Sequence, residues 1–247
     1  AYGLVRTKNM LAALLLFQAA RRWPGAVKSL VVGLARRALG PGVDVDTHFT
    51  PRYAPWDQRV CFVPDGDLFK AVASGRAEVV TDSIDRFTGR GLALASGREL
   101  EADIVVTATG LALNVLGDVA VSVDGVPRDL SQAVSYKALM LSDVPNLVYT
   151  FGYTNSSWTL KADLTARYTC RLLNTMQAAG LRVATPRLAP GVEPRPFFEL
   201  TSGYVQRAAD LLPRQGSTGP WRLTQNYLRD LVTLRFGRIA DGVLELR

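Results

Sequence analysis

In the stretch ADIVVTATG, residues 102–110, an apolar run is followed at once by four small residues. Ile104, Val105 and Val106 form a continuous apolar run of the kind found in a parallel strand buried on both faces. Ligands of α/β sheets bind at the carboxyl ends of such strands, and small residues there let a cofactor approach the backbone. Thr109 and Gly110 therefore mark either a cofactor-binding strand end or an ordinary tight turn, and the pattern alone favours neither.

A second candidate site lies where residues 146–152 (NLVYTFG) run into YTNSSWTLKADL. The pattern predicts a strand followed by a helix of about twenty residues, capped by Asn155 or Ser156 and ending at Gly180. The free N–H groups and the positive dipole end at such a helix start attract anions or an electron-rich ring. Every capped helix has such an end, so this signal is weak by itself.

The other reactive residue types are too few to support catalysis on their own. His48 is the only histidine, which disfavours a metal cluster or a Ser-His-Asp site. Cys61 and Cys170 lie in no CxxC motif, so a zinc site or a disulfide framework is disfavoured, and both are expected to be small core residues in a reducing compartment. Chemistry is therefore expected to come from a bound cofactor, with no metal.

Helices and short strands alternate along the chain and must position these sites. Gly and Pro punctuate the predicted helices, and Asp124-Gly125 is a hairpin signal. Helices are predicted within 2–39 (broken at Pro24-Gly25), over 65–75, over 155–180, over 202–212 and over 223–235. Strands are predicted over 59–63, over 77–87, 91–95 and 98–100, over 102–110 and 119–123, over 146–152, and as a final hairpin over 237–246.

The charge is positive and uneven. The net charge is +7, and residues 1–60 hold nine Lys/Arg against three Asp. A basic stretch of this kind serves an anionic membrane, a phosphorylated cofactor, nucleic acid or simply solvent. Basic residues interleaved with aromatics and nucleic-acid-binding motifs are both missing, so nucleic acid is disfavoured. The apolar run at 10–20 is too short to span a bilayer, so peripheral membrane contact through residues 1–40 is the membrane alternative.

Four blocks of sequence, in order along the chain, resemble the class B flavin monooxygenases of the Baeyer–Villiger type. They are HFTPRYAPWDQRVCFVPDGDLFKAV (48–72), ADIVVTATGL (102–111), YTNSSWTLKADL (153–164) and GYVQRAADLLPRQGSTGPWRLTQNYLRD (203–230). That family opens with a GxGxxG loop for FAD and has a second such loop for NADPH. This sequence contains no GxGxxG, so it resembles the C-terminal half of such an enzyme.

The resemblance implies an α/β fold, the C-terminal half of a flavoprotein with two dinucleotide-binding domains, Rossmann-like for FAD and for NADPH, and a helical insertion. Residues 1–57 resemble the helical insertion of the NADPH domain, residues 58–110 the rest of that domain, and residues 111–247 the C-terminal part of the FAD domain. The implied activity uses FAD, NADPH and O₂. It inserts one oxygen atom into a ketone, or adds it to the sulfur of a thioether, through a C4a-peroxyflavin.

One catalytic residue is implied by the resemblance. Arg59, in the block WDQR, matches the family's arginine beside the flavin, where an always-charged guanidinium would stabilise an anionic peroxide. Without the motif, Arg59 would be interpreted as a surface arginine. Ketone-accepting relatives commonly carry Lys just before it, against the NADPH 2′-phosphate. Gln58 stands here instead, which leaves the preference for NADPH over NADH open.

The remaining cofactor-binding candidates come from the other blocks. Thr109 and Gly110 are expected near the seam between the two cofactor domains. Trp158, Thr159 and Leu160 begin the long helix, whose amino end would point at the electron-rich pyrimidine edge of the flavin. Trp158 is interpreted equally well as a core aromatic. Trp221 and Asn226 are weaker candidates for lining the substrate side, because such tryptophans often serve packing alone.

Two other classes of function stay open. A non-catalytic remnant or interaction module would hold no flavin and would bind anionic lipid through residues 1–40. A reductase or oxidase of the same two-cofactor architecture would lack a stable peroxyflavin. No signal peptide follows Ala1, so the sequence predicts a processed start or a fragment, and a cytoplasmic protein, in contact with a membrane if residues 1–40 bind lipid. The chain alone is expected to be poorly soluble, because its parallel sheets would have unpaired edges.

Overall fold

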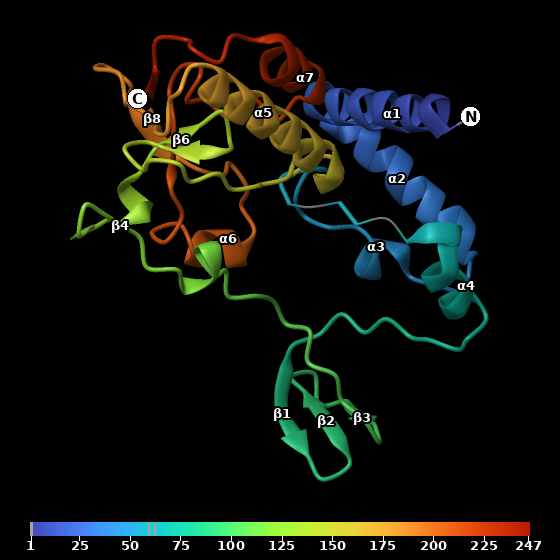
Figure 1. The fold of residues 1–247 in the computed structure, drawn as a ribbon. Helices are drawn as coiled ribbons and strands as arrows, with labels where there is room; N and C mark the ends of the chain where they lie inside the picture. The colour runs from blue at the N-terminus through green and yellow to red at the C-terminus, as the bar shows by residue number, and fades with distance from the viewer. Residues whose placement is uncertain (1, 59, 62) are drawn as a thin grey trace. The chain divides into compact units, whose positions relative to one another are not determined.

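The computed structural model describes residues 2–58, 60–61 and 63–247. Helices and short strands alternate along this part of the chain, as the sequence predicts (Figure 1). The α-helices are α1 Tyr2–Arg22, α2 Pro24–Leu39, α3 Val45–His48, α4 Asp67–Ala73, α5 Trp158–Ala178, α6 Gly203–Arg207 and α7 Tyr227–Phe236. The 3-10 helices are η1 Pro64–Gly66, η2 Val115–Asp118 and η3 Leu130–Gln132.

The named strands form one three-stranded sheet and four two-stranded ladders, all antiparallel. The three-stranded sheet contains β1 Ile84–Thr88, β2 Gly91–Leu94 and β3 Glu99–Glu101. The ladders pair β4 Ser122–Val123 with β5 Val126–Pro127, β6 Ser135–Tyr136 with β7 Met140–Leu141, β8 Ala184–Pro186 with β11 Leu244–Leu246, and β9 Pro194–Pro196 with β10 Arg214–Gly216. The parallel sheets of a Rossmann-like fold stay a prediction.

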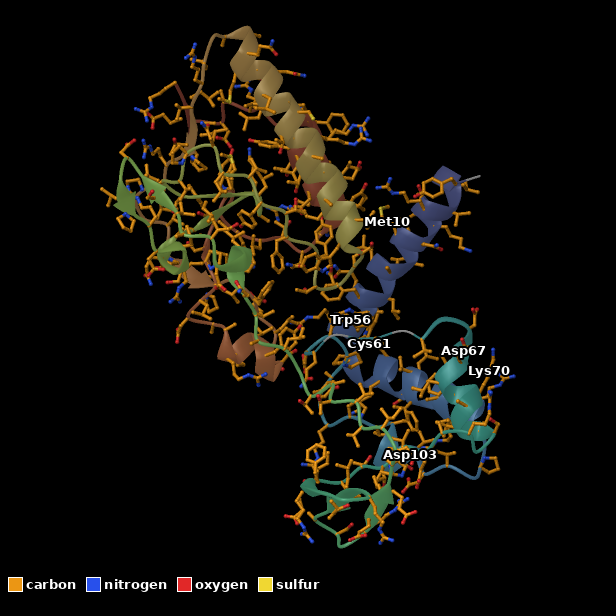
Figure 2. All side chains as sticks on the ribbon, turned by 60° about the horizontal axis from the view of Figure 1, so that its bottom comes forward. Met10, Trp56, Cys61, Asp67, Lys70 and Asp103 are labelled. Atoms are coloured by element: carbon orange, nitrogen blue, oxygen red, sulfur yellow. The ribbon has the colours of Figure 1, made fainter. Side chains whose placement is uncertain are left out.

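Several local predictions are confirmed because their signals lie within a few residues. Pro24 begins α2, and Gly40, with φ +76°, ends it. Asp124 and Gly125 both have positive φ and join β4 to β5 in a tight hairpin. Figure 2 labels Asp67 and Lys70 on α4, the helix predicted over 65–75, where they form an exposed ion pair of 3.5 Å.

The strand predicted at ADIVVTATG is wrong for this chain. Residues 104–110 are in no strand, and Ile104 and Val106 are each 82% exposed. Asp103, labelled in Figure 2, lies in a bend just after β3. A central strand forms only when neighbouring strands accept and donate its backbone hydrogen bonds, and no described strand pairs with this run. The apolar run is therefore present without its expected neighbours.

Four further predictions are corrected. Val60, Cys61 and Val63, the described part of the strand predicted at 59–63, are in no strand, and neither are residues 146–152. The final hairpin is also wrong, because β11 pairs with β8, far away in sequence, and not with a neighbouring strand. Both cysteines are exposed and free, although the sequence predicts them in the core.

The chain divides into two compact units. Unit 1 combines Ala1–Gln18 with Ala112–Arg247, and unit 2 is the continuous segment Ala19–Leu111. The assignment of residues 1–57, 58–110 and 111–247 to cofactor domains stays a prediction.

Unit 1 contains the largest hydrophobic core. In this core, α5 and α7 pack together, as Figure 1 shows, and their buried side chains share one cluster with those of β6 and β7. Its fully buried side chains include Tyr136, Leu164, Tyr168, Trp221 and Leu234. The smaller core of unit 2 is built from α2, α3 and α4 around Leu39, Val45 and Val72.

Candidate functional site

The amino end of α5 is the first part of the site. Ser157 is the N-cap residue, but its side chain makes no capping hydrogen bond with a backbone N–H of the helix, and its Oγ lies 2.8 Å from Thr159 Oγ1 instead. The first turn of this 21-residue helix contains no acidic residue. The positive end of the helix dipole is therefore not neutralised by an acidic side chain of its own first turn.

Trp158 and Gly152 are in close contact at this helix end. A Cβ atom added to Gly152 would lie 2.1 Å from Trp158 Cγ, so only glycine lets the indole lie against this backbone. Trp158 is 45% exposed, with its ring 4.8 Å from that of Phe151. Trp158 is thus a core aromatic only in part, because it packs against Phe151 but is 45% exposed.

Gln225 fixes the loop that leads into α5. Its Oε1 accepts hydrogen bonds from Thr154 N at 2.9 Å and from Thr154 Oγ1 at 3.1 Å. Its carbonyl oxygen accepts one from Asn155 Nδ2 at 2.8 Å. Asn155 is therefore tied to this distant segment and does not cap the helix, contrary to one of the two predicted caps. Ser156 is not the cap either, because the helix begins one residue later.

Behind the same loop, Lys161 and Asp230 form a buried ion pair. Lys161 Nζ lies 2.8 Å from Asp230 Oδ2, and the two side chains are 4% and 14% exposed. Tyr153 donates to the same carboxylate at 2.7 Å, and Thr224 Oγ1 donates to Asp230 Oδ1 at 2.7 Å. One carboxylate thus connects α5, α7 and the loop that presents the helix end.

A second buried pair lies close to the first. Lys137 Nζ lies 2.8 Å from Asp241 Oδ2, which also accepts a hydrogen bond from Tyr136 at 2.6 Å. Tyr168 OH lies 3.2 Å from Tyr136 OH and 3.4 Å from Lys137 Nζ. The two pairs are linked through the backbone, because Lys161 Nζ donates to Lys137 O at 3.3 Å.

Burial sets the protonation of these groups. It raises the pKa of Tyr153 far above the ordinary value, and the charge of Asp230 adds to this, so the phenol stays a hydrogen-bond donor. Burial lowers the pKa of Lys161, while Asp230 acts in the opposite direction. The carboxylate of Asp230 is therefore what allows a charged lysine at this depth.

A cavity of about 90 Å³ opens against this network. Its wall comes from the turn after β6, the loop before α5, the segment after Gly219 and the first turns of α7. The lining residues are Lys137, Ala138, Phe151, Gly152, Tyr153, Lys161, Phe197, Gly219, Pro220, Arg222, Leu223, Thr224, Gln225, Arg229, Asp230, Thr233 and Leu234.

The predicted cofactor residues are divided between the two units. Trp158, Thr159 and Leu160 lie together at the start of α5 in unit 1, with Thr159 exposed and Leu160 buried. Gln58, Thr109 and Gly110 belong to unit 2.

Within unit 2, Gln58 is half-buried and forms an isolated bridge with Pro55. Thr109 and Gly110 are exposed, and Gly110 has φ +126°, a conformation that favours glycine. Arg59 lies outside the described residues.

The two weaker candidates have structural roles here. Trp221 is 1% exposed and packs edge-on against Tyr136 in the core of unit 1, and it is not among the residues that line the cavity. Asn226 caps α7 by accepting a hydrogen bond from Arg229 N at 3.1 Å. Trp221 therefore packs in the core of unit 1, and its place on the substrate side stays a prediction.

Sequence reasoning missed Lys161 and Asp230. A signal for Lys161 was present, because it falls on the same helical face as Leu164, Tyr168 and Leu172, at spacings of three or four residues. A lone lysine on an apolar face indicates a buried charge that needs a partner. Nothing local in the sequence identifies Asp230 as that partner.

Metal and membrane features are limited in the described part of the chain. No group of three or more His, Cys, Asp or Glu side chains there is arranged to hold a metal ion. Among the described helices, none has the length and apolar character needed to cross a bilayer. The peripheral membrane contact of residues 1–40 stays a prediction.

Known proteins resemble this chain along almost its whole length, although no family model matches it. FAD-containing monooxygenase EthA of Mycobacterium tuberculosis is 51% identical over 242 residues, which cover 98% of this chain and 50% of the relative. EthA of Mycolicibacterium smegmatis is 47% identical over 92% of the chain and 46% of the relative. The "Probable FAD-binding monooxygenase AlmA" of an Acinetobacter species is 44% identical over 99% of the chain and 50% of the relative.

The chain spans about half the length of the curated relatives it matches. The resemblance predicted from the four sequence blocks is confirmed at the level of FAD-containing monooxygenases.

Proposed function

We propose that this chain, similar over its length to one half of the FAD-containing monooxygenases, is the C-terminal half of an FAD- and NADPH-dependent monooxygenase. The reaction inserts one oxygen atom of O₂ into a ketone, in the Baeyer–Villiger manner, or adds it to the sulfur of a thioether. The observation that carries the proposal is the 51% identity over 98% of the chain, which includes the segment around the start of α5.

The amino end of α5 fits one edge of a flavin. Its first turn has no acidic residue, and Gly152 leaves room for the half-exposed Trp158 beside it. Free N–H groups at a helix start are suited to the electron-rich pyrimidine edge of the ring system. Bound FAD, once reduced by NADPH, supplies the electrons that activate dioxygen.

In the proposal, residues of this chain hold the helix end in position and form the surface that meets the ring. Gln225 and Asp230 hold the loop before α5, so the helix end keeps one position as the ring binds. Trp158 would pack along the ring, and Thr159 is exposed at the same helix end. Leu160 is buried and anchors this first turn.

The other cofactor-binding candidates belong to unit 2 and are proposed from the resemblance alone. We propose Arg59 as a fixed cation that stabilises negative charge on the oxidising group, and Gln58 as a neutral partner of the NADPH ribose phosphate. Thr109 and Gly110 would lie at the seam, where the exposed run 104–106 would pair with strands of the two cofactor domains.

The proposal is tested on the protein expressed from its gene together with the coding sequence upstream of Ala1. We expect GxGxxG loops in the upstream region, a bound flavin with its visible absorption, and O₂-dependent NADPH oxidation that yields an ester or a sulfoxide. A protein that holds no flavin, or that oxidises NADPH with neither ketone nor thioether converted, would contradict it.

Arg59→Ala separates the proposed monooxygenase from a reductase or oxidase of the same architecture. If Arg59 acts on the oxidising group, flavin reduction by NADPH is preserved while oxygenated product falls by about a hundredfold or more, as for other lost electrostatic stabilisers. Arg52→Ala is the matched control, because Arg52 is an exposed arginine of the same sequence block. An equal loss of oxygenated product in both variants would contradict a specific role of Arg59.

A further inference from the structure

The cavity beside Lys161 has an unusual charge balance. Four cationic side chains line it, Lys137, Lys161, Arg222 and Arg229, against the single carboxylate of Asp230. The charge of Lys137 is met by Asp241 and that of Lys161 by Asp230, each at 2.8 Å. These two pairs account for the buried ammonium groups but leave both arginines uncompensated.

Arg222 and Arg229 are exposed, and neither side chain forms an ion pair or a hydrogen bond within the described residues. Both nevertheless line the cavity, one from the segment after Pro220 and the other from the first turn of α7. Two arginines, with ten N–H donors between their guanidinium groups, thus belong to the lining of one small cavity without an ion-pair partner of their own.

Lys161 adds a donor from the buried side. An ammonium group has three N–H donors. Two of them meet Asp230 Oδ2 and the backbone oxygen of Lys137, at 2.8 and 3.3 Å. The side chain is only 4% exposed and lines the cavity, so a third donor is available to a molecule inside it.

We infer that this cavity is a binding site for a small oxyanion, a phosphate or carboxylate group, held by Lys161 from inside and by Arg222 and Arg229 at the mouth. This inference does not depend on the proposed function.

The size of the cavity agrees with such a ligand. At about 90 Å³ the cavity is several times larger than the space that a single water needs, and it has room for one phosphate or carboxylate group. Guanidinium groups bind both anions through paired N–H donors, and Thr224 and Gln225 add polar atoms to the same wall. A cation in the cavity would be repelled by the unpaired charges of Arg222 and Arg229 and by Lys161, whose charge Asp230 already balances, so a cationic ligand is disfavoured.

The site is distinct from the helix end proposed for the flavin, although one loop separates them. Phe151, Gly152 and Tyr153 line the cavity on one side and lead to α5 on the other. An anion bound to Lys161 and Arg229 would therefore stiffen that loop. The ligand could be a free ion or the acidic group of a larger molecule, and the two sources share this chemistry.

The test is calorimetric titration of the 247-residue chain with potassium phosphate and with potassium acetate, at constant ionic strength in potassium chloride. We expect saturable binding of at least one anion. Arg222→Gln and Arg229→Gln should each weaken it about tenfold, the loss that corresponds to one charge-assisted hydrogen bond of about 1.4 kcal/mol. Tighter phosphate binding would identify a phosphate group, and tighter acetate binding a carboxylate.

Arg238→Gln is the matched control, because Arg238 is exposed, belongs to unit 1 and does not line the cavity. It should bind as the unchanged chain does, and Arg222→Lys should regain part of the affinity lost in Arg222→Gln. Near-UV circular dichroism checks that each variant is folded. Absence of saturable binding for both anions, or an equal loss in Arg238→Gln, would overturn the inference.

Discussion

Lys161 Nζ and Asp230 Oδ2 lie 2.8 Å apart although 69 positions separate the two residues in the sequence. The pair connects α5 to α7, and Tyr153 joins it from the loop before α5. Since that loop leads directly to the helix end proposed for the flavin, a buried ion pair supports the local geometry of the candidate site.

Lys161→Met should destabilise unit 1 by about 3–5 kcal/mol, because it leaves the carboxylate of Asp230 buried without its cation. The free energy of unfolding from urea titrations measures this. Arg167→Met on the same helix is the control, since Arg167 and Asp163 form an exposed pair, and should cost at most about 1 kcal/mol. A similar loss of unfolding free energy in both variants would mean that Lys161 does not balance a buried charge of Asp230.

Asp241 should make the stability of unit 1 sensitive to acid. Burial raises the pKa of this carboxyl, but hydrogen bonds from Lys137 and Tyr136 and the charge of Lys137 together lower it below its ordinary value. The folded state therefore binds this proton less readily than the unfolded state. The stabilisation is complete above the ordinary value of about 3.9 and is lost as the pH falls through the lower folded-state pKa.

The measurement is the unfolding free energy of the unchanged chain and of Asp241→Asn as a function of pH. The difference between them should be constant above about pH 5 and should shrink below about pH 4. A difference that instead grew as the pH fell would show that the pKa is raised.

Gly152→Ala should displace Trp158, because the new Cβ would lie 2.1 Å from its Cγ atom. Overpacking of this kind costs about 1–3 kcal/mol. In the double variant Gly152→Ala with Trp158→Ala, the cost of the alanine at 152 should largely disappear, because the colliding ring is gone. Thermal unfolding of all four members of this cycle measures the coupling, and simple additivity would argue against the contact.

Ile104→Asp and Val106→Asp should leave the stability of this chain unchanged within about 0.5 kcal/mol, since both side chains are exposed. Val134→Asp, at a position only 1% exposed, should prevent folding of unit 1. In the longer protein expressed with its upstream sequence, the same two aspartates should be severely destabilising if the run then forms a buried strand. Urea unfolding of both forms distinguishes the two environments.

The elements that sequence predicts well are those with local signals. The break at Pro24, the helix that ends near Gly180 and the hairpin at Asp124-Gly125 depend on backbone preferences of one or two residues. The positions of Trp158, Thr159 and Leu160 at a helix start follow from the same kind of signal.

The elements that sequence predicts poorly depend on distant partners. The run 104–106 has the composition of a buried strand, but composition cannot supply the neighbouring strands that would pair with it. The partner of β11 is β8 for the same reason, and Asp230 becomes a site residue only because α7 packs on α5. Exposed cysteines could not be foreseen, because their burial depends on which side of a helix or loop meets the core.

The discontinuity of unit 1 has a consequence for the order in which the protein forms during synthesis. Unit 2 is one continuous segment, so it can fold as soon as Leu111 has left the ribosome. Unit 1 has to wait, because β11 completes the ladder with β8 and Arg247 exchanges backbone hydrogen bonds with Val183. Residues 1–18 belong to unit 1, so they cannot take their place in that unit until residues 112–247 have been made, and during that time they stay exposed to chaperones and proteases.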